Sequence, residues 1–285
     1  MNEIKRVLIH IRWPLQSFTL LGFLFGVVVS RANLSLDLIL GFVAWFFLCA
    51  GIVIFNSYYD KDVNPVAGLE NPPTATFSML IGAWMLKLSG FIIALFLNKI
   101  FLLAYVTAVV LSVLYSHKNF RFKSNGYIAV IFNFISGAMT FVVASSFSLT
   151  NTAILFLGSI TAGFFLAAIY LMMQVHQKEE DKTRGYTSIM ILYGKKITLV
   201  SAICLMIITA VLSSITLILS GLHPLYFLII VIYFVAILFI SYVWSNKREE
   251  SVSDFKTMNK LTISLSYTAN LILITVYIFD ILLKI

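Results

Sequence analysis

The chain has 285 residues, of which 60% are hydrophobic and only 11% are charged. A soluble domain carries about 25% charged residues, so this composition excludes an ordinary soluble protein and indicates a surface that faces lipid. The net charge of +8 could also suit a nucleic-acid-binding protein, but the positions of the basic residues, described below, argue against a nucleic-acid partner.

Long apolar stretches follow one another along the whole chain. A helix that crosses the hydrocarbon layer needs roughly 20 mostly apolar residues, because that layer is about 30 Å thick. The sequence therefore predicts an all-α membrane bundle of nine spanning helices, give or take one, in a single transmembrane domain over 1–285. The stretches cover residues 14–30, 35–56, 77–97, 100–116, 126–148, 152–174, 197–220, 223–245 and 260–283.

The basic residues predict which way the chain crosses the membrane. Of the 20 Lys and Arg residues, Arg31, Lys99 and Lys284 fall on one side and Lys87 falls within a span, which leaves sixteen on the other side. Cytoplasmic loops carry an excess of Lys and Arg, so we expect the N-terminus and the longer polar loops in the cytoplasm. The protein is expected to be a multi-pass protein of a bacterial or archaeal cell membrane.

The first long polar loop follows the second span and reads IFNSYYDKDVNPVAGLENPPTATFS. Asn56, Asp60 and Asn64 are spaced by four, so a continuing helix places them on one face. Asp62 lies off that face unless the helix ends near Pro65, as a proline favours. Carboxylate and amide oxygens are ligands that suit Mg²⁺, which takes one or two carboxylates plus waters and substrate phosphates.

The second long polar loop follows the sixth span and reads MMQVHQKEEDKTRGYTSIMILYGKK. Helical spacing lets Gln177, Glu180 and Asp181 point into one space. The bases Lys182 and Arg184 follow directly, and bases bind phosphate oxygens while acids bind Mg²⁺. The two loops together predict a site for Mg²⁺ and a diphosphate. Simple solvation of the acidic residues is the alternative explanation for either loop alone.

These two loops resemble the aspartate-rich motifs of the UbiA-type intramembrane prenyltransferases, N-D-x-x-D-x-x-x-D and D-x-x-x-D, in a family with nine transmembrane helices. In the first loop Asn56 matches the leading Asn and Asp60 the first metal-binding Asp, while Asn64 stands in place of the last Asp. In the second loop Asp181 lies four residues before Gly185, as in the family's D-x-x-x-G ending.

The sequence also departs from the family pattern. Gln177 stands where the first Asp of the second motif is expected, with Glu180 as a substitute ligand. The family commonly places N-K-P-x-R-P after the first motif, and the corresponding stretch here, AGLENPP, has neither Lys nor Arg. After the fourth span, Tyr115, Lys118, Arg121 and Lys123 resemble the tyrosine and the basic residues that family members use near the diphosphate.

The resemblance implies Mg²⁺-dependent transfer of an isoprenoid chain from a polyprenyl diphosphate to a lipophilic acceptor, around a central cavity that opens to membrane lipid. The implied catalytic residues are Asp60, Glu180 and Asp181. The implied diphosphate-binding residues are Tyr115, Lys118, Lys182 and Arg184. The implied metal ligands are Asn56, Asp60, Asp62, Asn64, Gln177, Glu180 and Asp181.

Three other classes of membrane protein are alternatives to this interpretation. A secondary transporter places polar residues and broken helices near the bilayer midplane, whereas this sequence gathers its acids at one face. A non-catalytic member that binds prenyl lipid stays open, because the Lys and Arg after the first motif are missing. The CDP-alcohol phosphotransferases also use membrane aspartates and Mg²⁺, but their D-x-x-D-G-x-x-A-R signature is absent.

Overall fold

The computed structural model describes residues 2–62, 66, 68–148, 151–222, 224–245 and 252–283, and over these residues the chain forms helices and no β-strand. The helices are α1 (Glu3–His10), α2 (Trp13–Ser30), α3 (Leu36–Asp60), α4 (Phe77–Ala94), α5 (Lys99–Ser116), the 3₁₀-helix η1 (Phe122–Ser124), α6 (Gly126–Ser145), α7 (Thr152–Gln174), the 3₁₀-helix η2 (Val175–Gln177), α8 (Lys178–Thr183), α9 (Ile189–Leu219), α10 (Pro224–Ser245) and α11 (Val252–Leu283).

The membrane character expected from composition is confirmed. Among the described residues, eight helices are long and apolar enough to cross a membrane, in agreement with the expected nine give or take one. Several of them begin at a polar residue whose side chain accepts a hydrogen bond from a free N–H of the first turn. These residues are Ser35, Asn98, Asn125 and Asn151.

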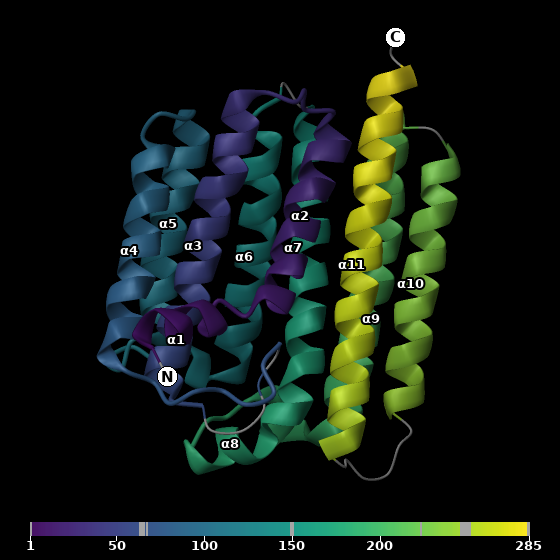
Figure 1. Cartoon of the computed structure of the whole chain (residues 1–285). Helices are drawn as coiled ribbons and strands as arrows, with labels where there is room; N and C mark the ends of the chain where they lie inside the picture. The colour runs from purple at the N-terminus through teal and green to yellow at the C-terminus, as the bar shows by residue number, and fades with distance from the viewer. Residues whose placement is uncertain are drawn as a thin grey trace.

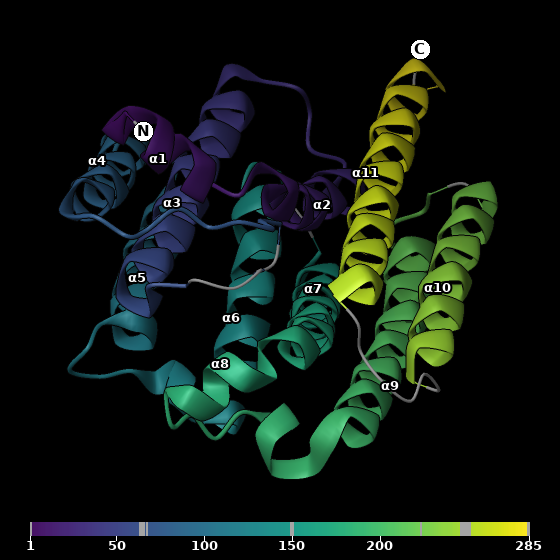
Figure 2. The ribbon, with the colours of Figure 1, turned by 60° about the horizontal axis from the view of Figure 1, so that its bottom comes forward.

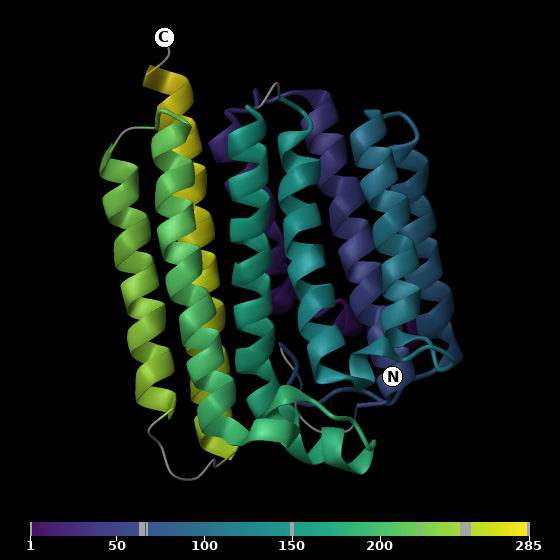
Figure 3. The same ribbon diagram turned by 180° about the vertical axis from the view of Figure 1, so that it is seen from behind.

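The long helices stand side by side, and the short helices α1 and α8 lie at one end of the bundle (Figure 1). Seen from that end, α2 lies inside the row of helices, and it packs against α3, α6, α7 and α11 (Figure 2). From behind, α10, α9, α7 and α6 follow one another in a row (Figure 3). The start of α1 and the C-terminal end of α11 lie at opposite ends of the bundle (Figure 1).

Three helices extend beyond the spans expected from the apolar stretches. Helix α3 continues to Asp60, α11 begins at Val252, and α9 begins at Ile189 instead of near residue 197. Helix α9 bends at Gly194, which has a φ of 76° that only glycine adopts without strain. Hydropathy marks where lipid begins, whereas the helices run on into the polar face. As a result, Asn56 and Asp60 share one continuous helix.

Helix α1 was not expected from the apolar stretches, because it is short and polar on one side. It is followed by a sharp turn at Arg12, whose φ of 53° and ψ of 59° lie in the left-handed region. Residues other than glycine adopt this conformation rarely. The turn takes the chain from α1, which crosses the ends of α3 and α4, into the spanning helix α2 (Figure 1).

Candidate functional site

A polar cavity of about 250 Å³ lies near the α8 end of the bundle. Helices α2, α3, α5, α6 and α7 form its walls, and residues from η1 and the α8 region close its polar end. Asn56, Asp60, Gln177, Asp181 and Arg184 come from the two loops that the sequence singled out. The other charged or amide side chains of the lining are Arg12, Gln16, Lys123 and Asn133, which come from outside those loops.

The first loop begins where α3 ends. Asn56 and Asp60 are one helical turn apart on α3 and both line the cavity. Lys61 then adopts a left-handed conformation with a φ of 53°, so the helix ends at Asp60, earlier than the expected end near Pro65, and Asp62 lies beyond it. Asp62 is buried beside the cavity, where it serves as the meeting point of two arginines.

The first of these arginines is Arg12, from the turn between α1 and α2. Its Nη2 donates to Asp62 Oδ2 at 2.8 Å and to Ser57 Oγ at 2.9 Å. The side chain is buried and lines the cavity, and its Nε has no hydrogen-bond partner among the described residues. A buried guanidinium with an unused donor at a cavity wall is suited to an anionic ligand.

The second arginine is Arg184, which joins the two loops. Its Nη2 donates to Asp62 Oδ1 at 2.9 Å and to the carbonyl oxygen of Asp60 at 3.0 Å. The same nitrogen lies 3.4 Å from Glu180 Oε2. Gly185, with a φ of 70°, follows and ends α8 as the sequence predicted. The chain Arg12–Asp62–Arg184–Glu180 thus connects the N-terminal turn, the first loop and the second loop.

Lys123, from η1, neutralises the charge of Asp60. Its Nζ donates to Asn56 Oδ1 at 2.7 Å and forms an ion pair with Asp60. Two backbone hydrogen bonds fix η1 beside the second loop, from Thr187 N to Ser124 O at 2.8 Å and from Gly126 N to Thr187 O at 3.0 Å. Burial lowers the pKa of Lys123, and the nearby Asp60 carboxylate opposes that shift.

Asp181 faces the same cavity from the second loop, beside Gln177. Burial raises its pKa from the usual value of 3.8 to about 6, and the charge of Asp60 adds to this shift. A carboxylate destabilised in this way is one that a nearby cation favours strongly. Asp60, Asp181 and the amides of Asn56 and Gln177 therefore form an oxygen-only donor set that suits a hard cation. Within the described residues, no three His, Cys, Asp or Glu side chains already form a metal-binding cluster.

The cavity becomes apolar with distance from the charged end. A second cavity of about 110 Å³ lies between α3, α5 and α6, and it shares Cys49, Ile52, Tyr115, Asn133 and Ser136 with the first. Its far end is lined by Trp45, Ala108 and Met139. We refer to it below as the branch cavity. Together the two cavities offer a charged region continuous with an apolar one, which fits an amphipathic ligand.

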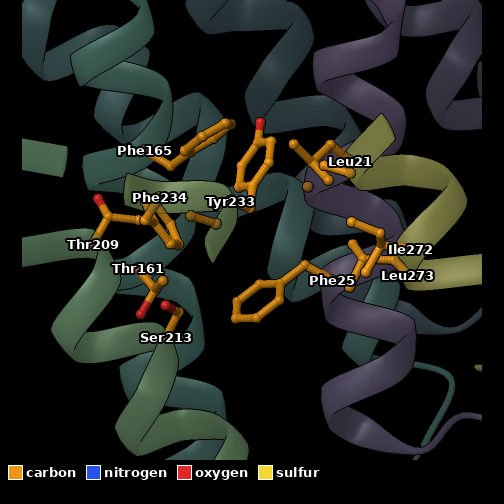
Figure 4. Close-up of a pocket in the computed structure, with 13 residues that line it drawn as sticks. Leu21, Phe25, Thr161, Phe165, Thr209, Ser213, Tyr233, Phe234, Ile272 and Leu273 are labelled. Atoms are coloured by element: carbon orange, nitrogen blue, oxygen red, sulfur yellow. The ribbon is translucent and has the colours of Figure 1, made fainter. Parts of the chain in front are cut away.

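A third cavity, of about 70 Å³, is separate from this site. It lies between α2, α7, α9, α10 and α11 and shares no lining residue with the other two (Figure 4). Four of its lining residues bear a hydroxyl. Thr161, Thr209 and Ser213 each donate to a carbonyl oxygen of their own helix, whereas the buried Tyr233 hydroxyl has no hydrogen-bond partner among the described residues. The walls are otherwise apolar, so this cavity offers no group for metal or phosphate chemistry.

The structure places the residues selected from the sequence in three groups. Those that line the charged end or its apolar continuation are Asn56, Asp60, Tyr115, Gln177, Asp181 and Arg184. Asp62 and Glu180 are buried behind the lining and paired with arginine. Lys118 and Lys182 are exposed and do not line the cavity. Asn64 lies outside the described residues.

Lys118 and Lys182, which the resemblance assigns to the diphosphate, are both exposed, and other cations line the cavity in their place. Lys118 follows the end of α5 and lies on the surface turn, whereas Lys123, five residues later, reaches the cavity. Lys182 is next to Asp181 on α8, and adjacent helical residues point about 100° apart. From the sequence, Arg12 indicates only the orientation of the chain in the membrane. The one sequence feature that could have indicated a role at the site is its position, two residues before the proline at the start of a span.

The comparisons with known proteins agree with this arrangement. A sequence model of the UbiA prenyltransferase family matches residues 17–266. A UbiA homolog from Archaeoglobus fulgidus, bound to GPP and Mg²⁺, aligns over 93% of this chain and 99% of its own, with 21% identity and a TM-score of 0.70. No curated protein matches the chain by sequence.

Two further solved structures share the fold. A structure described for digeranylgeranylglyceryl phosphate synthase in membranes aligns over 98% of this chain and 99% of its own, with 21% identity and a TM-score of 0.66. The apo structure of a UbiA homolog from Aeropyrum pernix K1 aligns over 93% of this chain and 98% of its own, with 18% identity and a TM-score of 0.66.

Proposed function

Because the chain belongs to the UbiA prenyltransferase family, we propose that it transfers the isoprenoid chain of a polyprenyl diphosphate to a lipophilic acceptor within the membrane and releases diphosphate. The observation that carries this proposal is the cavity in which carboxylates and cations from both loops meet an apolar branch. A prenyl diphosphate has the same division into a charged end and an apolar chain. The Archaeoglobus fulgidus homolog was solved with such a molecule, GPP, and Mg²⁺.

The donor set at the charged end fits Mg²⁺. Asp60 and Asp181 would hold two such ions, with Asn56 and Gln177 as neutral oxygen ligands, and the remaining positions would go to water and phosphate oxygens. When bound, Mg²⁺ supplies positive charge that stabilises the departing diphosphate. Lys123 pairs with Asp60 in the present arrangement, so we expect it to exchange this contact for a phosphate oxygen when Mg²⁺ binds.

The cations at the cavity are proposed to hold the diphosphate. Arg12, Lys123 and Arg184 line it from three separate parts of the chain. Arg12 would replace the basic residues that the stretch after the first motif lacks, because its guanidinium is buried at the wall with an unused donor. Arginine suits this role through its fixed fork of donors.

A charge balance supports this assignment. The four carboxylates of the site carry −4, and the three cations that meet them carry +3. A diphosphate of about −3 with two Mg²⁺ ions brings the total near zero, which a partly buried site at a membrane boundary requires.

In the proposed reaction the bond between C1 of the prenyl group and the diphosphate oxygen breaks, and its electron pair leaves with the diphosphate. Arg12, Lys123 and Arg184 stabilise the negative charge that develops there. The allylic cation that remains lies beside Tyr115 and Tyr170, whose rings line the cavity and can stabilise positive charge through their faces. The acceptor then forms a bond to C1 and loses a proton.

The proposal is tested with membranes that contain the protein, labelled prenyl diphosphates of several lengths and a set of lipophilic acceptors, with the lipid products identified by mass spectrometry. We expect a Mg²⁺-dependent product that is lost on chelation and restored by added Mg²⁺. Divalent-dependent binding of the donor without any product would instead favour the non-catalytic, lipid-binding interpretation.

A further inference from the structure

The N-terminal helix α1 has two faces that contact different surroundings. It lies across the ends of α3 and α4, at the same end of the bundle as the charged cavity (Figure 1). One face points away from the protein and the other contacts the end of the first loop. The two faces together suggest that α1 connects the membrane surface to that loop.

The outer face of α1 is apolar. Ile4 and Leu8 are one helical turn apart and are 68% and 48% exposed. Trp13, at the start of α2, is 55% exposed and stacks on Phe46 with 5.4 Å between ring centroids. Exposed apolar side chains of this kind are unfavourable in water, whereas leucine and isoleucine on an amphipathic helix, and tryptophan in particular, are favoured at a bilayer interface.

The inner face of α1 is bonded to the last residues of the first loop. Arg6 Nη1 donates to the carbonyl oxygen of Thr74 at 2.8 Å and to its Oγ1 at 3.1 Å. The ring Nε2 of His10 lies 3.0 Å from the carbonyl oxygen of Pro73. Thr76 Oγ1 donates to Glu3 Oε2 at 2.8 Å. These contacts fix the stretch that leads into α4.

The beginning of the same loop is held from the same segment. Arg12, two residues after α1 ends, bonds Asp62 and Ser57. The N-terminal segment therefore contacts both ends of the first loop, over separations of 45 to 75 residues in sequence. A shift of α1 relative to the bundle would move both ends of the loop at once.

The bilayer is the occupant that the position of α1 indicates. The spanning helices of the same chain fix where the hydrocarbon layer ends, and α1 lies across the ends of two of them with its apolar face outward. We propose that α1 lies in the bilayer interface, with Ile4, Leu8 and Trp13 among lipid, and that its inner face thereby holds the first loop in place at the cavity. The consequence for substrate binding rests on the function proposed above, whereas the position of α1 and its hold on the loop do not.

The position of α1 is tested by spin labelling in liposomes. In a variant whose native residues Cys49 and Cys204 are replaced by alanine, a label is attached at Leu8→Cys, and its accessibility to molecular oxygen is compared with that to a water-soluble nickel complex. We expect the oxygen accessibility to dominate. A matched label at Lys118→Cys, on the surface turn after α5, should favour the nickel complex. Equal behaviour of the two labels would overturn the proposal.

The hold on the loop is tested by hydrogen exchange in the reconstituted protein. The Ile4→Ser/Leu8→Ser variant removes only the lipid-facing side chains, whereas Arg6→Ala removes the bonds to Thr74 together with the exposed Arg6–Glu3 ion pair. We expect the backbone amides of residues 68–76 to exchange about tenfold faster or more in both variants, which corresponds to the loss of a hydrogen bond to a charged group. The exchange rates of the spanning helices should not change. Unchanged exchange in both variants would refute the coupling.

Enzyme kinetics separates this inference from the proposed function. If both are correct, the Ile4→Ser/Leu8→Ser variant shows a higher KM for the prenyl diphosphate, while kcat changes less. If no prenyl transfer occurs in the unaltered protein, the proposed function fails, but the accessibility and exchange results still decide the role of α1.

Discussion

Arg184 Nη2 and Asp62 Oδ1 lie 2.9 Å apart and join the second loop to the first across 122 residues of sequence. Asp62 holds a second arginine on its other oxygen, where Arg12 Nη2 lies 2.8 Å away. The side chains of Arg12 and Asp62 are buried, and that of Arg184 is only 20% exposed. The two loops therefore act as one structural unit, and the first predictions concern that unit.

Removal of the shared carboxylate should destabilise the protein strongly. Asp62→Ala leaves two guanidinium groups without their common partner in a buried position, and breaking such a pair costs about 3–5 kcal/mol. We expect a large fall in the thermal midpoint of the detergent-solubilised protein. Asp37→Ala, which removes an exposed carboxylate from the first turn of α3, should cost only about 0.3–1 kcal/mol. Similar midpoints for the two variants would contradict the assigned role of Asp62.

Each cavity-facing aspartate should be essential for prenyl transfer. Asp60→Ala and Asp181→Ala each remove a charged oxygen ligand, so Mg²⁺-dependent product should fall to background in membranes. Lys118→Ala and Lys182→Ala serve as controls, because both lysines are exposed and outside the cavity lining. We expect these two to keep activity within about twofold, as surface changes usually do. Unchanged turnover in both aspartate variants would reject the site.

Arg12 should contribute to donor binding through its guanidinium. Arg12→Gln removes the charge, and the loss of charged hydrogen bonds of about 1.5–3 kcal/mol each predicts a fall in kcat/KM of at least about tenfold, mainly through KM. Arg31→Gln is a matched control, because Arg31 has a nearly identical φ, 51° against 53°, and follows the other end of α2. Equal kinetic effects of the two changes would argue against a direct role for Arg12.

The branch cavity should limit which donors fit. Ser136 lies where the branch joins the charged cavity, so Ser136→Phe should obstruct the passage for an apolar chain. We expect kcat/KM to fall for long prenyl diphosphates and to change little for the shortest one. Thr107→Phe, at an exposed position on α5, places the same ring outside the cavity and should leave the length preference unchanged. A uniform loss over all donor lengths would mean that the chain lies elsewhere.

Much of the fold and part of the site could be read from the sequence, because both follow from local rules. Apolar stretches long enough to cross a bilayer predicted the spanning helices. The spacing of Asn56 and Asp60 predicted a shared helical face, and both line the cavity. Gly185 marked the end of α8. In each case the relevant atoms are within one or two turns of each other, so helix geometry alone relates them.

The remaining features depend on contacts between distant segments. Asp181 lines the cavity and its neighbour Glu180 does not, and likewise Lys123 lines it and Lys118 does not. Both differences follow from how α8 and η1 are oriented against the bundle.

Arg12 reaches the cavity because a left-handed turn redirects the chain between α1 and α2, and no spacing rule connects it to Asp62, 50 residues away. The sequence alone established a membrane bundle with two acidic loops. Tertiary packing decided which cations meet those acids, because partners this far apart are brought together only when the helices assemble.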